Sequence, residues 1–104
     1  MIDYEVNLTV NENIFAEYYA WLIEHIKEIL QFPGFLHAVI GEVQTEQNIT
    51  HKMLRVCYTL LSESHLNDYL SLHAPKMRAE AVNRFGDKFS ATRRVIVELT
   101  TLKN

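Results

Sequence analysis

Apolar and polar side chains alternate over the first ten residues. The apolar positions are Ile2, Tyr4, Val6, Leu8 and Val10, and the polar ones are Asp3, Glu5, Asn7 and Thr9. A period of two predicts a strand with one buried and one polar face. The apolar period then changes to three and four, through Phe15, Tyr19, Leu22, Ile26 and Ile29. This spacing predicts an amphipathic helix, capped by Asn11 or Asn13 and ended by the Pro33-Gly34 turn.

Two further strands are predicted at about residues 35–43 and 50–60. The polar segment Thr45-Glu46-Gln47-Asn48 connects them, and so short a connection predicts an antiparallel hairpin. The second of these strands has two distinct faces. One carries Leu54, Val56, Tyr58 and Leu60, and the other carries Met53, Arg55, Cys57 and Thr59.

The last third of the chain reads as a second helical region and a final strand. Ser62 or Ser64 begins the helix, and its inward stripe is Leu66, Leu70, His73, Met77 and Ala81. Pro75 would remove one helical hydrogen bond, so we expect a kink or a restart with Pro75 in the new first turn. Gly86 suits the positive φ of a helix end. The final strand alternates Phe89, Ala91, Arg93, Val95, Val97 and Leu99 with Ser90, Thr92, Arg94, Ile96, Glu98 and Thr100.

This order of elements, βαββαβ, predicts an α+β fold of the ferredoxin-like kind. It is a four-stranded antiparallel sheet with two helices on one face, and we expect one domain over residues 1–104. The other face of the sheet mixes polar and apolar side chains. It would carry Asp3, Glu5, Asn7, Thr9, Arg55, Cys57, Thr92, Arg94 and Glu98 together with Val39, Met53 and Ile96.

Composition narrows the class of protein. The apolar share of 48% fits a folded globule, and the single cysteine, Cys57, cannot form an internal disulfide. The first residues do not have the pattern of a signal peptide, and no apolar run reaches the ~20 residues that span a bilayer. We therefore expect a cytoplasmic protein without membrane contact.

Charge is unevenly distributed along the chain. The formal net charge is −7 over residues 1–74 and +4 over residues 75–104. We expect this asymmetry to reflect either charge pairing within the fold or an anion-binding patch. The chain as a whole has a formal net charge of −3, which argues against nucleic acid as a partner.

One segment carries a family resemblance. It runs His73-Ala74-Pro75-x-Met77-Arg78-x-Glu80-Ala81-x-x-Arg84-Phe85-Gly86-Asp87-Lys88-Phe89 and is followed by Arg93-Arg94-Val95. With the first strand, the first helix and the Pro33-Gly34-Phe35 turn, it resembles a family of short bacterial proteins known as a domain of unknown function. The resemblance implies a ferredoxin-like fold, similar to the dimeric α+β barrel group in which two such sheets face each other. It implies no activity and no catalytic residue.

The remaining chemistry is sparse, and the catalytic residues stay unknown. The histidines lack metal-ligand spacing, so the sequence predicts no metal, and no motif calls for a cofactor. His73 lies in the apolar stripe, either bonding a freed carbonyl before Pro75 or acting as an acid–base or ligand group. Cys57 is expected to be a small buried thiol.

The basic end of the chain supplies the other candidates. Arg93 is expected to run under a helix end and pair with a carboxylate. Arg94 should reach Asp3 or Glu5 across the open face. As an alternative to such ion pairs, Arg55 and Arg94 together could hold a small organic anion or a phosphate. His73, Arg55, Arg94 and Arg78 are the predicted ligand-binding residues.

Two functions follow. The first is a non-catalytic module that forms a homodimer through the open sheet face or a sheet edge. The second, by analogy with the dimeric barrels, is a cofactor-free oxygenase-like enzyme, a haem-handling protein or a small-ligand binder. A deep pocket that holds His73 or Arg94 would favour the second function, and a filled or flat sheet face the first.

Overall fold

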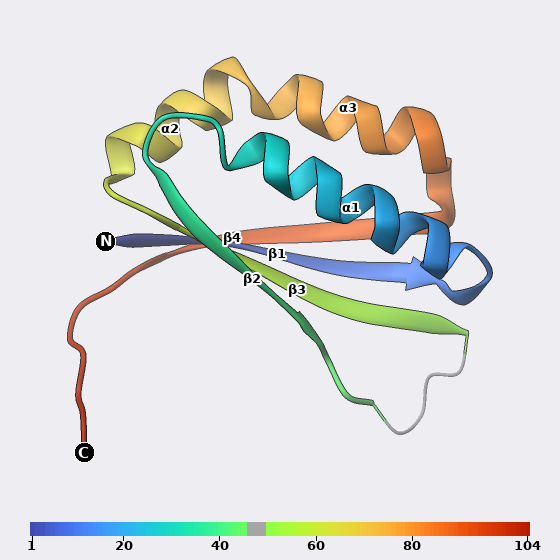
Figure 1. Cartoon of the computed structure of the whole chain (residues 1–104), viewed down its shortest axis with the longest axis horizontal. Coiled ribbons are helices and arrows are strands. Elements are labelled where there is room, and N and C mark those ends of the chain that lie inside the picture. Colours follow the sequence, from blue (N-terminus) through green and yellow to red (C-terminus); the bar gives the residue numbers. More distant parts are fainter. Residues whose placement is uncertain (46–49) are drawn as a thin grey trace.

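The four strands of the sheet lie in the order β2-β3-β1-β4, with every neighbouring pair antiparallel and the helices on one face (Figure 1). The computed structural model describes residues 1–45 and 50–104. Its elements are β1 (Ile2–Asn11), α1 (Phe15–Ile29), β2 (Phe35–Glu42), β3 (His51–Leu60), α2 (Glu63–Leu72), α3 (Ala74–Phe85) and β4 (Phe89–Val97). This is the predicted ferredoxin-like α+β fold. The β2–β3 hairpin is confirmed, while the predicted connection lies, apart from Thr45, outside the described residues.

The strand register sorts the side chains onto the two faces as predicted. Tyr4 stands opposite Tyr58 on β3 and opposite Val95 on β4, on the face that the helices cover. Glu5 stands opposite Cys57 and Arg94 on the open face. Although Glu5 lies on this open face, only 2% of it is exposed.

The predicted inward side of β4 is also only partly buried. Phe89 and Ala91 pack against the core, but Val95 and Val97 are 46% and 56% exposed. The reason is that β4 is an edge strand, so its side chains have a neighbouring strand on one side only.

In α1 the predicted stripe is wrong at one position. Tyr18 is 1% exposed and Tyr19 is 40% exposed, although the sequence favoured Tyr19. Both positions fit the helical period, because Leu22 lies four residues after one and three after the other. The partners decide between them: Tyr18 lies 4.9 Å from Phe85 and 5.3 Å from Phe89, measured between ring centroids, whereas Tyr19 stacks on Phe15.

The restart before Pro75 is confirmed. The helix α2 ends at Leu72, α3 begins at Ala74, and Pro75 stands in the first turn of α3. The His73 N–H donates to the Tyr69 carbonyl at 2.9 Å, and the His73 carbonyl accepts from the Met77 N–H at 3.1 Å. Backbone hydrogen bonds therefore continue across the junction in spite of the proline. None of the described helices is long and apolar enough to cross a membrane.

Candidate functional site

A cavity of about 50 Å³ lies between the sheet and the helices. Its polar lining consists of Tyr4, Tyr18, His25, Tyr58, Tyr69, Arg78 and Arg93, which come from all three helices and from β1, β3 and β4. The apolar walls include Trp21, Leu22, Val56 and Met77. One water needs roughly 10–15 Å³ of such space, so the cavity has room for a group of a few heavy atoms.

Three tyrosine hydroxyls of the cavity have no hydrogen-bond partner among the described residues. They belong to Tyr18, Tyr58 and Tyr69, which are 1%, 3% and 4% exposed. No buried side-chain oxygen or nitrogen of the described chain is both sealed and unpaired, so these oxygens reach accessible space. Buried tyrosine hydroxyls normally find a partner within the protein. These three groups are instead available to whatever occupies the cavity.

Two arginines bring positive charge to the same cavity. The Arg78 guanidinium donates from Nη2 to the Tyr4 hydroxyl at 3.0 Å. Arg93 shares the inward phase of β4, as predicted, but the expected carboxylate partner is wrong: it forms no ion pair within residues 1–45 and 50–104. Among the described residues, no aspartate or glutamate lines the cavity.

The tyrosines act as hydrogen-bond donors at neutral pH. Burial raises the pKa of Tyr18 to about 12 and that of Tyr69 to about 12, and it raises the pKa of Tyr58 as well. The Arg93 charge opposes the rise in pKa for all three, so it acts on their hydroxyls. The phenols thus stay protonated beside a positive charge.

His25 closes part of the cavity wall. Its ring stacks on Trp21 at 4.4 Å between centroids, and its Nδ1 lies 3.9 Å from Glu80 Oε2. Burial lowers the pKa of His25, and the negative charge of Glu28 only partly opposes this. The imidazole is therefore neutral at pH 7, and its long contact with Glu80 is not a strong ion pair.

The open face of the sheet carries a different group of charges, the Glu5 cluster of Glu5, Arg55, Arg94 and Asn7. Arg94 Nε donates to Glu5 Oε1 at 2.6 Å, and Arg55 Nε donates to Glu5 Oε2 at 2.7 Å. Hydrogen bonds from Arg94, then Asn7, then Arg55 lower the pKa of Glu5 to about 2. The predicted reach of Arg94 to the first strand is confirmed, with Glu5 as the partner. The carboxylate that lies between Arg55 and Arg94 is therefore the side chain of Glu5 itself.

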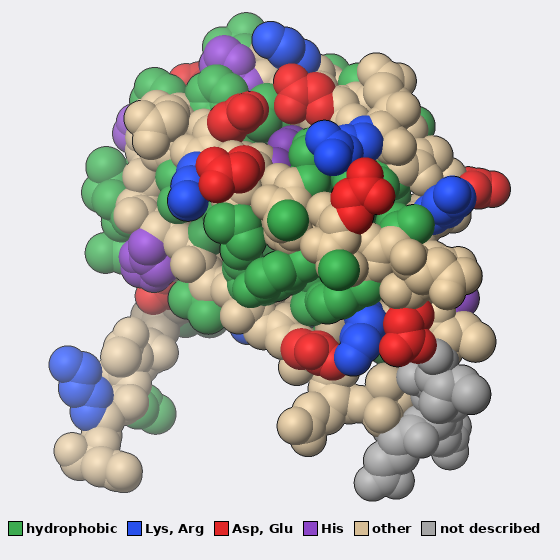
Figure 2. Space-filling model, turned by 45° about the vertical axis from the view of Figure 1, so that its right-hand side comes forward, with side chains coloured by type: hydrophobic (Ala, Val, Ile, Leu, Met, Phe, Trp, Pro, Cys, Tyr) green, Lys and Arg blue, Asp and Glu red, His purple; other side chains and the backbone are tan. Residues whose placement is uncertain are grey.

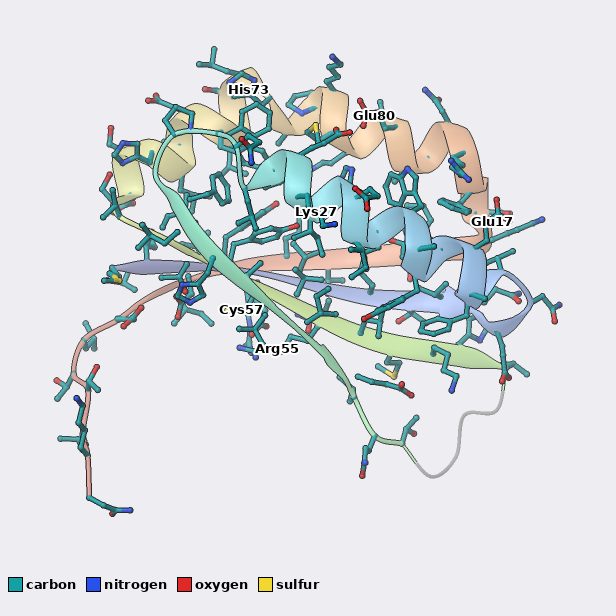
Figure 3. The ribbon with its side chains drawn as sticks, viewed as in Figure 1. Glu17, Lys27, Arg55, Cys57, His73 and Glu80 are labelled. Carbon is teal, nitrogen blue, oxygen red and sulfur yellow. The ribbon has the colours of Figure 1, made fainter. Side chains whose placement is uncertain are left out.

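The four residues predicted to bind a ligand therefore lie in different places. Only Arg78 lines the cavity, while Arg55 and Arg94 meet at Glu5 on the opposite side of the sheet. His73 belongs to the helix layer (Figure 3), where its ring stacks on Phe32 at 4.1 Å between centroids. Their role in binding stays a prediction.

Cys57 lies on the open face beside Arg55, on the side of the sheet away from the helices (Figure 3). It is half-buried, and burial raises the pKa of its thiol. A protonated thiol is a poor nucleophile. Within the part of the chain that the structure describes, no group of three His, Cys, Asp or Glu side chains could hold a metal ion.

A second hollow of about 190 Å³ lies between the start of α1 and β2. It is more open, and Phe15, Tyr19, Ile40, Gly41, Glu42 and Leu54 line it. Figure 2 shows hydrophobic side chains in a band on this side of the molecule, with acidic and basic side chains above and below. The hollow has one charged side chain and offers no convergent polar groups, so it is the weaker candidate.

The spacing of the sequence did not reveal the cavity, because Tyr4 and Tyr58 alternate in phase with apolar core residues, while Tyr18 and Tyr69 lie outside the predicted helical stripes. One signal was present: Arg93 shares its face of β4 with apolar residues, and an inward arginine needs a polar partner. That Arg93 would share a cavity with four tyrosines could not be read from spacing, since these tyrosines come from four different elements.

Comparison with known proteins identifies a family and a fold. The family model described as a domain of unknown function, DUF4286, matches residues 1–99. No curated protein matches the sequence.

Solved structures of similar fold include a dimeric ferredoxin-like protein from an uncultured marine organism and a putative antibiotic biosynthesis monooxygenase from Deinococcus radiodurans. Each shares 12% identity over 100% of both chains, with TM-scores of 0.73 and 0.71. A cofactor-independent oxygenase from Streptomyces nogalater shares 12% identity over 99% of this chain and 98% of its own, with a TM-score of 0.67. At such identities the likeness establishes the fold alone.

Proposed function

This chain belongs to the DUF4286 family, a domain of unknown function, and we propose that it binds a small ligand in the tyrosine-lined cavity between its sheet and helices. The observation that carries the proposal is the set of three buried tyrosine hydroxyls that have no partner among the described residues. Tyr18, Tyr58 and Tyr69 lie around one cavity and come from three separate elements.

A purely structural core would not need these hydroxyls. Phenylalanine would fill nearly the same volume without bringing a polar group into a place that is at most 4% exposed. Three such groups at one cavity are better explained by a ligand that accepts their hydrogen bonds. Ligand pockets commonly combine apolar walls with a few convergent polar groups in this way.

The proposal can be tested with variants that remove only the hydroxyls. In Y18F/Y58F/Y69F the ring packing stays, so we expect the apo protein to keep or gain thermal stability. A panel of small organic acids, phenols and neutral analogues is screened by thermal shift and followed by calorimetry. A ligand that stabilises the wild type should lose its effect on the triple variant. Tyr19→Phe is the matched control, because Tyr19 is 40% exposed and lies outside the cavity.

The proposal fails if the triple variant binds the ligand as tightly as the wild type. It also fails if no ligand binds and the triple variant is less stable, since the hydroxyls would then support the fold itself.

A second candidate function is the homodimerising module. On the open face Val39 is 59% exposed, and beyond β4 Leu99 and Leu102 are 91% and 88% exposed. A fold neighbour is described as dimeric, and exposed apolar residues of this kind are commonly covered by association. Sedimentation equilibrium at micromolar concentration should give twice the 12.2 kDa of the chain. A single species at 12.2 kDa would exclude the dimer at that concentration.

A further inference from the structure

We infer that the ligand of the cavity is a small organic anion with a carboxylate head, held by Arg78, Arg93 and the tyrosine hydroxyls. The inference rests on the proposed function and adds to it the chemical class of the ligand. Its first support is charge: two guanidinium groups line the cavity, and among the described residues no carboxylate does.

The pairing of the five arginines singles out the same two residues. Arg55 and Arg94 share the Glu5 carboxylate, and Arg84 lies 3.4 Å from Glu17. The two that form no ion pair among the described residues are Arg78 and Arg93, and both line the cavity. A chain with more acidic than basic residues has thus left these two charges for another anion.

The tyrosine hydroxyls of the cavity can serve as donors to such an anion. The Tyr4 oxygen accepts from Arg78 at 3.0 Å, which leaves the Tyr4 hydrogen free to donate elsewhere. Tyr18, Tyr58 and Tyr69 can each donate one O–H as well, since burial keeps them protonated. Hydrogen bonds from neutral donors and from guanidinium groups to a charged acceptor are stronger than those between neutral groups.

Size and wall chemistry favour an organic acid over a larger anion. About 50 Å³ suits a carboxylate and a short apolar portion, which Leu22, Val56 and Met77 would contact. Both arginines line the cavity and are also exposed, so they lie where it opens to solvent. The head of the anion would lie near this opening and its apolar part deeper between sheet and helices.

The test compares acids with their neutral amides. Propionate, butyrate and benzoate are titrated by calorimetry beside propionamide, butyramide and benzamide, with inorganic phosphate and sulfate as separate ligands. We expect the best acid to bind at least tenfold more tightly than its amide. Arg93→Gln should weaken the acid about tenfold or more and leave the amide unchanged, while Arg93→Lys should keep most of the affinity. Arg84→Gln is the control, because Arg84 pairs with Glu17 and does not line the cavity.

Each result has a distinct meaning. If the acid and its amide bound equally well and Arg93→Gln had no effect, the inference that the ligand is an anion would be wrong. The proposal that the cavity binds a ligand would still hold. Tighter binding of phosphate or sulfate than of any carboxylate would overturn the organic acid. Absence of binding by every acid and amide would overturn this inference. The proposed function fails with it only if phosphate, sulfate and the phenols of the wider panel do not bind either and Y18F/Y58F/Y69F is less stable than the wild type. Melting temperatures of the unliganded variants identify any loss of folding. If Arg93→Gln does not fold, the affinity of Arg93→Lys for the acid and for its amide tests the inference instead.

Discussion

Replacing Glu5 by glutamine should remove a measurable part of the stability of the fold. The Glu5 side chain is 2% exposed and accepts hydrogen bonds from Arg94 at 2.6 Å, Arg55 at 2.7 Å and Asn7 at 3.0 Å. Glutamine keeps the shape of the side chain but has no charge for the two guanidinium groups to share. Any loss therefore reports on the charge and on the acceptor oxygen that the amide nitrogen replaces, not on packing.

The size of the effect follows from the pKa of Glu5, which falls from 4.5 to about 2 on folding. At 1.36 kcal/mol per pH decade this corresponds to about 3 kcal/mol. The covering side chains of Arg55 and Arg94 are 48% and 69% exposed, so solvent lies one side-chain layer away. Screening of such pairs reduces the expected loss to about 1–2 kcal/mol at pH 7. For a domain of this length, that is a fall in melting temperature of roughly 5–15 °C.

The pH dependence has a definite sign. Since folding lowers the pKa of Glu5, the stabilisation is fully present above pH 4.5 and is lost as the pH falls toward 2. The free energy of unfolding is measured by urea titration, with Trp21 fluorescence and circular dichroism, at pH 7 and pH 3. The gap between wild type and Glu5→Gln should narrow by about half or more at the lower pH. Two protein concentrations are compared at each pH, because association would make stability depend on concentration.

The matched control is Asp3→Asn on the same strand and face. Asp3 accepts one hydrogen bond from Thr59 Oγ1 at 3.1 Å and forms no ion pair with an arginine in the described part of the chain. We expect that change to cost less than about 0.5 kcal/mol. If Glu5→Gln were as stable as Asp3→Asn at pH 7, or if its gap to the wild type stayed constant down to pH 3, the cluster would not stabilise the fold through its charges.

Two further predictions concern Gly34 and His25. Gly34 has φ +88°, and a Cβ there would overlap the His65 side chain, so Gly34→Ala should cost at least about 2 kcal/mol in chemical denaturation. Gly41→Ala, where an added Cβ meets nothing within 4 Å, should change stability by less than 1 kcal/mol; equal losses would contradict the packing explanation. For His25, burial lowers the pKa from 6.5, so the unfolded chain takes up a proton first and the folded protein should lose stability as the pH falls below about 6.5. His25→Gln should flatten the dependence of melting temperature on pH between 7.5 and 5.5, and the exposed His37→Gln should not; an unchanged slope in His25→Gln would show that the His25 imidazole takes up its proton equally well in both states.

The sequence by itself determined the order and type of the elements. The alternation of apolar and polar residues predicted β1, and the recurrence of apolar residues at steps of three and four predicted α1. Pro75 indicated where the second helical region restarts, and Gly86 indicated where it ends. These features depend on neighbours along the chain, because side-chain period, a missing N–H and a positive φ are local properties. The same alternation also assigned Glu5 and Arg94 to the open face, where β1 and β4 pair.

The tertiary structure decided which of two equivalent positions is buried and which charges meet. Tyr18 and Tyr19 fit the helical period equally well, and the rings of Phe85 and Phe89 on distant elements select Tyr18. Glu5 is buried because two arginines from separate strands cover it. The cavity is the clearest case. Its tyrosines and arginines come from β1, α1, β3, α2, α3 and β4, and only the packing of helices on the sheet brings their polar ends to one place. Periodicity states which way a side chain points, whereas a site depends on distances between elements, and those are set by packing.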